Sequence, residues 1–164
     1  MIAFRSDPTG ETLVKYNDLI ENASKKHNIN PDIVRAICIV ESGLDTWAVR
    51  YEAGWRWWLS PIKWGKRVGV TTRTERVCQQ MSWGLMQIMG TVARERGFKG
   101  DIPNLCQPDV GLEFGCKHLR WLLDRHKSLD RALSAYNTGR PDTRAGRDYT
   151  HEVMLVMEGK SWIS

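Results

Sequence analysis

The segment from residue 30 to residue 43 constrains the fold of this chain more than any other. Its body, residues 33–40, reads Ile-Val-Arg-Ala-Ile-Cys-Ile-Val and is apolar almost all round, and a helix of that composition is normally buried. Asn30 can cap such a helix, Pro31 suits its first position, and Gly43 can end it. We therefore predict a buried helix between residues 30 and 43.

Further helices are predicted on both sides of this segment. We expect them over Thr12–Lys26, Thr91–Arg96, Pro108 to about His126, Leu129–Tyr136 and Tyr149–Met157. Residues 43–82 keep no period of 2 or 3.6, so we expect loops and short strands there, with a short helix near residues 74–80. The prediction is a mainly helical domain with one irregular, aromatic-rich excursion.

Length and composition indicate one globular domain over residues 1–164. The chain has 41% hydrophobic and 26% charged residues, the balance of an ordinary globular protein. No apolar run approaches the roughly 18 residues of a membrane span, and the first residues lack the pattern of a secretory signal. The formal net charge of +5 favours an anionic partner such as nucleic acid, a membrane surface or an acidic cell wall.

The cysteines and histidines show no metal-binding spacing, and we expect neither a metal nor a cofactor. No CxxC pair occurs, and no histidine lies at zinc-finger spacing from Cys38, Cys78, Cys106 or Cys116. We expect four reduced thiols, with Cys38 and Cys116 as small core residues. A Cys106–Cys116 disulfide is the main alternative.

Glu41 is the first candidate for chemistry. It follows Ile33 by eight residues and Ile37 by four, so it shares their face at the end of the buried helix. Apolar surroundings and the negative end of the helix dipole both disfavour a carboxylate, so the pKa of Glu41 should rise. A carboxylic acid that stays protonated near neutral pH can act as a general acid. The alternative is a surface glutamate paired with an arginine.

Two later clusters carry little information when taken alone. In Ser82-Trp83-Gly84-Leu85-Met86-Gln87-Ile88 the amide of Gln87 lies between apolar residues and needs hydrogen-bond partners. In Ala135-Tyr136-Asn137-Thr138-Gly139 the last residues could simply end the preceding helix.

Taken together in their order along the chain, these motifs make the sequence resemble the soluble lytic transglycosylase family and its relative, goose-type lysozyme. The resemblance spans about residues 15–157. It rests on Glu41-Ser42 after an apolar helix, Gly84-Leu85-Met86-Gln87-Ile88, Ala135-Tyr136-Asn137-x-Gly139 and Tyr149-Thr150-x-x-Val153.

The resemblance implies a lysozyme-like α+β fold, predominantly α-helical, and cleavage of peptidoglycan at the β-1,4 bond after N-acetylmuramic acid. It makes Glu41 the catalytic acid. By position, Ser42 and Gln87 would hold the sugar or the Glu41 side chain, Met86 would pack against a sugar face, Tyr136 and Asn137 would line the floor, and Tyr149 would hydrogen-bond near Glu41.

The sequence departs from the family pattern between its first two motifs, where 41 residues intervene from Gly43 to Trp83. We treat residues 45–82 as an aromatic-rich insertion. Trp57 and Trp58 could stack on sugar rings, and the nearby Arg and Lys could meet carboxylates or phosphates of the wall. The alternative is a local hydrophobic cluster that pins a long loop.

Two enzyme mechanisms remain open from the sequence. A lytic transglycosylase uses Glu41 alone, first as acid and then as base. An inverting muramidase needs a second carboxylate roughly 6.5–9.5 Å away, for which Glu75 is the preferred candidate and Glu52 and Asp45 are others. A salt bridge with Arg73, Arg76 or Arg94 is the structural alternative for Glu75.

Other function classes compete with these enzymes. The basic charge and the tryptophans would also suit a nucleic-acid-binding protein, but no helix has a basic stripe and no nucleic-acid motif occurs. A catalytically silent wall-binding or virion part is a third class. We expect a monomer that acts on the bacterial cell wall as a phage lysin, a virion component or a secretion-system enzyme.

Overall fold

A computed structural model describes residues 16–159 of the protein. The fold is α+β and predominantly helical, as predicted. Its elements are α2 (Asn17–Lys26), α3 (Pro31–Ser42), β1 (Val49–Tyr51), α4 (Pro61–Val68), α5 (Thr72–Gln79), β2 (Met81–Trp83), β3 (Ile88–Met89), α6 (Gly90–Glu95), the 3-10 helix η1 (Ile102–Cys106), α7 (Pro108–His126), α8 (Leu129–Thr138) and α9 (Arg144–Met157). The first residues of the helix predicted from Thr12 lie outside the described residues.

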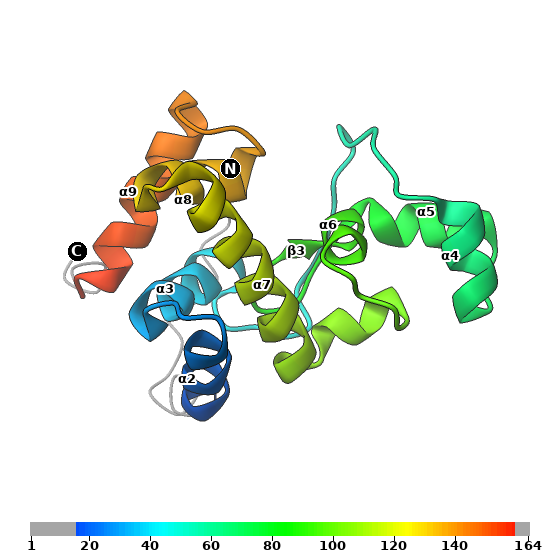
Figure 1. Cartoon of the computed structure of the whole chain (residues 1–164), viewed down its shortest axis with the longest axis horizontal. Helices are drawn as coiled ribbons and strands as arrows, with labels where there is room; N and C mark the ends of the chain where they lie inside the picture. Colours follow the sequence, from blue (N-terminus) through cyan, green and yellow to red (C-terminus); the bar gives the residue numbers. More distant parts are fainter. Residues whose placement is uncertain (1–15, 160–164) are drawn as a thin grey trace.

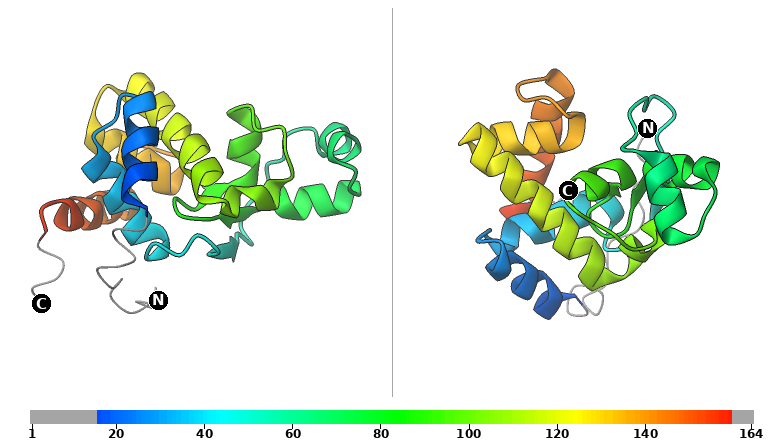
Figure 2. Two further views of the ribbon diagram at one scale, coloured as in Figure 1. Left: turned by 90° about the horizontal axis from the view of Figure 1, so that it is seen from below. Right: turned by 45° about the vertical axis from the view of Figure 1, so that its right-hand side comes forward.

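The helices form two groups, and the long α7 packs on elements of both (Figure 1). Helices α2, α3, α8 and α9 gather at one end, where α9 packs on α3 and α8, and the long α7 packs on α2 and α8. Helices α4 and α5 pack on each other at the opposite end, and they lie apart from α9 in every view (Figures 1 and 2). Helices α4 and α5 therefore form one end of the molecule.

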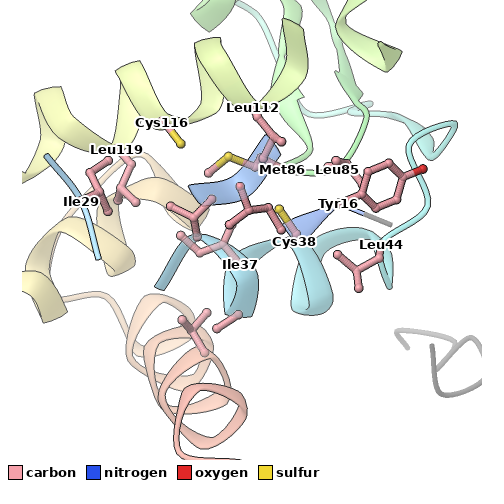
Figure 3. Close-up of a cluster of buried hydrophobic side chains, with 14 of the residues drawn as sticks. Tyr16, Ile29, Ile37, Cys38, Leu44, Leu85, Met86, Leu112, Cys116 and Leu119 are labelled. Carbon is pink, nitrogen blue, oxygen red and sulfur yellow. The ribbon is translucent and has the colours of Figure 1, made fainter. Parts of the chain in front are cut away.

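Helix α3 forms at the predicted residues, for the predicted reasons. The Asn30 side chain accepts a hydrogen bond from the Asp32 amide at 2.9 Å, Pro31 is the first helical residue, and Gly43 ends the helix with φ of 59°. Ile37 and Cys38 are fully buried in the main core, and they face α7 (Figure 3). Burial of this one helix therefore organises the core.

A short antiparallel sheet has the strand order β1-β2-β3 and packs on α6, η1 and α7. Val49 pairs with Trp83, and Ser82 pairs with Met89. The turn between β2 and β3 needs a glycine, because Gly84 has φ of 69° and a Cβ there would lie 2.4 Å from the Leu105 carbonyl oxygen. This turn carries Met86 and Gln87.

Helix α4 is a correction to the prediction of loops and short strands before residue 74. Pro61 begins it and Gly69, with φ of 76°, ends it. Its eight residues make little more than two turns, and Gly65 within them lowers the helix propensity. Its Trp64 ring packs on a remote arginine, Arg94, whose guanidinium carbon lies 4.4 Å from the ring centre. That contact depends on the tertiary fold.

All four cysteines are free, so the Cys106–Cys116 disulfide is not formed. Cys38 and Cys116 are buried core residues, as predicted. Among residues 16–159 no helix has the length and apolar character that crossing a bilayer requires.

Candidate active site

Glu41 lies in the last turn of α3 and is partly exposed. Burial raises its pKa from 4.5 to about 7; the Tyr149 hydroxyl and the positive charge of Arg50 oppose the rise, and the negative charges of Glu152 and Glu52 add to it. The shift has the direction that the helix position predicts. Glu41 can therefore hold or release a proton near neutral pH.

Tyr149 of α9 is the polar neighbour of Glu41 in the core. Its hydroxyl lies near enough to the Glu41 carboxyl to lower the Glu41 pKa. The distance or angle between them falls short of a full hydrogen bond, and the hydroxyl has no other partner within residues 16–159. Burial and the nearby Glu41 raise the pKa of Tyr149 well above its usual value. The phenol therefore stays neutral and can donate its proton to a Glu41 carboxylate.

Two hydroxyl groups tie the turn between β2 and β3 to the helices around Glu41. Ser42 Oγ donates to the carbonyl oxygens of Cys38 at 2.9 Å and Leu85 at 2.8 Å. Tyr136 Oη donates to the Met86 carbonyl oxygen at 2.8 Å. The motifs of α3, the turn and α8 thus meet at one place.

Gln87 closes the same turn from the side of the sheet. It adopts φ of 46°, and its Nε2 donates to the carbonyl oxygens of Ala48 at 2.9 Å and Gly84 at 3.0 Å. Both hydrogens of the amide nitrogen are therefore used within the protein. Gln87 and Ser42 hold the backbone beside Glu41 in position.

A family model described as Transglycosylase SLT domain matches residues 18–153, a span that contains every one of these residues. The chain belongs to this family. Its members are peptidoglycan lytic transglycosylases, enzymes that act on the cell wall. No curated protein sequence matches the chain.

Met86 does not fit the role predicted for it in this SLT protein. Its side chain is fully buried between α7 and α3 (Figure 3), packed so closely on Gly115 that a Cβ there would lie 2.4 Å from the sulfur. The thioether cannot pack against a sugar. The contribution of Met86 is its carbonyl oxygen, which holds Tyr136.

Glu75, the predicted second carboxylate, is 1% exposed. Its two oxygens accept from Arg94 Nε at 2.9 Å and Nη2 at 3.1 Å, and Gln79 donates to it as well. Arg94 was one of the three salt-bridge partners that the sequence allowed. This pairing directs the Glu75 carboxylate into the protein and gives it no open side on which to position water.

The structure shows two other carboxylates near Glu41. Glu152 of α9 and Glu52 after β1 both influence its pKa. Glu52 accepts from Arg50 Nε at 2.5 Å and Ser82 Oγ at 2.9 Å. Sequence reasoning missed Glu152, although its position three residues after Tyr149 places both on one face of a helix.

The side chains of the remaining predicted site residues differ in their exposure to solvent. Asn137 is exposed near the end of α8. Trp57 is 59% exposed, and its indole Nε1 donates to Glu95 at 3.1 Å. Trp58 is more enclosed: its Nε1 donates to the Arg76 carbonyl oxygen at 3.1 Å, and the Arg76 guanidinium lies 4.3 Å from its ring centre.

Proposed function

We propose that the protein cleaves the β-1,4 bond between N-acetylmuramic acid and N-acetylglucosamine and leaves a 1,6-anhydromuramic end. Glu41 first protonates the leaving oxygen. The resulting carboxylate then takes a proton from the 6-hydroxyl of the muramic acid, and that oxygen attacks the anomeric carbon. The supporting observation is the pKa of about 7 for Glu41, because one group serves as acid and then base most easily near its pKa.

The main alternative, an inverting muramidase that uses Glu41 with Glu75, has less support. An inverting enzyme needs an ionised carboxylate that faces the water it activates, and both Glu75 oxygens are engaged by Arg94. Product analysis separates the two. Fragments released from purified peptidoglycan should lack a reducing end and weigh one water less than hydrolysed ones. Reducing-end muramic acid as the sole product would make the enzyme a lysozyme.

Residues 1–164 act as one catalytic domain, residues 45–82 are an insertion within it, and the active form is a monomer that needs no cofactor. The substrate is the glycan strand, which fits a phage lysin, a virion component or a secretion-system enzyme. Ser42, Gln87 and Tyr136 support the site through the backbone contacts above, and Asn137 contacts sugar.

The pH profile should follow Glu41. Above about pH 7 the acid is lost, so kcat/KM should fall about tenfold per pH unit on the alkaline side. Arg50 lowers the Glu41 pKa and pairs with Glu52. Arg50→Gln should therefore move the alkaline limb to higher pH, measured by release of soluble fragments from labelled peptidoglycan. A limb that stays in place or moves down would contradict the assignment of Glu41.

Trp57 should bind glycan directly, whereas Trp58 supports the insertion. Trp57→Ala should weaken binding of glycan fragments about 2- to 12-fold, the effect of losing one aromatic contact. The thermal midpoint should change little, because the side chain is largely exposed. Calorimetric titration and thermal melting test this, with Trp58→Ala as the comparison. If Trp57→Ala lowers the melting temperature and leaves binding intact, Trp57 is only a structural residue.

A further inference from the structure

Residues 50–80, the larger part of the insertion, have a strongly positive surface, because their two acidic groups are already paired. Between residues 50 and 80 there are seven Lys or Arg and two Glu. Glu75 is buried against Arg94, and Glu52 pairs with Arg50. The six remaining cations are exposed, and no ion pair joins them to a carboxylate within residues 16–159; they are Arg56, Lys63, Lys66, Arg67, Arg73 and Arg76.

An open pocket of about 440 Å³ lies within this surface, between the Trp58 loop and α5. Three of its lining residues occur at positions 73, 76 and 77, on one face of α5, and Gln80 follows at the end of the helix. The pocket is lined by Trp58, Thr72, Arg73, Arg76, Val77 and Gln80. It thus combines two guanidinium groups with the apolar walls of an indole and a valine.

The pocket suits a short peptide with free carboxylates better than a sugar or a base. Arg76 lies over one face of the Trp58 ring at 4.3 Å, so that face is closed to stacking. Guanidinium groups bind carboxylates through two parallel hydrogen bonds, and Val77, 43% exposed, offers a surface for methyl side chains. The volume falls in the range of about 300–1,000 Å³ that is usual for small-ligand sites.

A run of side-chain contacts connects the insertion with the surroundings of Glu41. Trp57, next to the pocket, bonds Glu95 of α6, and Glu95 Oε2 lies 3.6 Å from Arg96 Nη2. From there the contacts are Arg96 over Trp121 at 4.1 Å, Trp121 stacked with His118 at 6.0 Å, and His118 with Tyr136 at 5.5 Å. A glycan strand along this run would bring its stem peptides to the insertion.

Two polar side chains of this run, His118 and Arg96, are partly buried. Buried Nδ1 of His118 and Nε of Arg96 form no hydrogen bond within the part of the chain that the structure describes. Burial and the nearby Arg96 lower the pKa of His118 to about 3, so its ring is neutral. His118 therefore adds no positive charge to this run.

We propose that the pocket between Trp58 and α5 binds the carboxylate-bearing stem peptide of the glycan strand held at Glu41. The inference rests on the proposed function and adds a preference to it: peptide-bearing strands bind more tightly than bare ones. Arg73 and Arg76 are the residues that set this preference.

The test measures binding in the Glu41→Gln protein, which holds substrate without turning it over. The probes are peptide-bearing glycan strands, the same strands stripped of peptides by an amidase, and peptide-bearing strands whose carboxylates have been amidated. Arg73→Gln with Arg76→Gln should reduce the preference for peptide-bearing over stripped strands about tenfold, the usual effect of losing a charged hydrogen-bonding partner. Amidation of the ligand should have the same effect on the protein with both arginines.

Lys66→Gln with Arg67→Gln is the matched control, because it removes two charges from α4 without touching the pocket. It should keep the preference. An equal loss in both double variants, or displacement of the peptide-bearing strand by single-stranded DNA at equal concentration, would show a general anion surface and overturn the proposal. A protein that binds neither peptide-bearing nor stripped strands would instead refute the proposed function, so the two failures are distinguishable.

Discussion

Replacing Glu41 with Gln should lower the rate of peptidoglycan cleavage by on the order of 10²–10⁴-fold while the protein still folds and binds glycan. The substitution keeps the shape of the side chain and removes its proton-transfer chemistry. The structure makes this effect specific, because Ser42 and Tyr136, which hold the nearby turn, bond backbone carbonyls and not Glu41. Fragment release and binding of glycan, measured on the same preparation, test the prediction.

The thermal stability of the Glu41→Gln variant serves as its control. The pKa of Glu41 predicts the direction in which this stability changes. The Glu41 pKa rises from 4.5 to about 7 on folding, so the folded state favours the protonated form. That stabilising contribution is complete below pH 4.5, and it is lost as the pH rises through about 7, by up to roughly 3 kcal/mol. Glu41→Gln should therefore melt at an equal or higher temperature than the wild type at pH 8. Near-wild-type lysis by a folded variant would remove Glu41 from the mechanism.

Glu75→Gln should act through stability and leave the chemistry intact. Arg94 is fully buried, and removing its partner leaves an uncompensated charge, which costs about 3–5 kcal/mol. In a chain of this length the melting temperature should fall by roughly 6–20 °C. The carbonyl oxygens of Phe98 and Gly100, which also accept from Arg94, keep the loss at the lower end of this range.

Glu52→Gln is the matched control for that experiment. Its partner Arg50 is 57% exposed, so breaking this pair should cost less than about 1 kcal/mol. The activity per folded molecule of Glu75→Gln, measured well below its melting temperature, should stay within a few-fold of the wild type. A roughly 10²-fold loss of activity in a protein of unchanged stability would instead identify Glu75 as a general base.

The sequence alone determined the elements whose signals are local. The ends of α3 follow from a capping side chain, a proline and a glycine within the helix itself or beside it. Helix α7 has the predicted ends, Pro108 and His126. The rise in the Glu41 pKa also followed from position, because a residue in phase with a buried helix face loses water whatever covers that face.

Tertiary structure decided which distant residues meet. Glu75 pairs with Arg94, nineteen residues away, rather than with Arg73 or Arg76, because α6 packs on α5 with Arg94 buried, whereas Arg73 and Arg76 are exposed. Met86 is buried because α7 presents a glycine to it, and Glu152 joins Glu41 because α9 packs on α3. Capping and periodicity act within a few residues of the chain, whereas these contacts depend on how whole helices pack, and a single sequence does not specify that packing residue by residue.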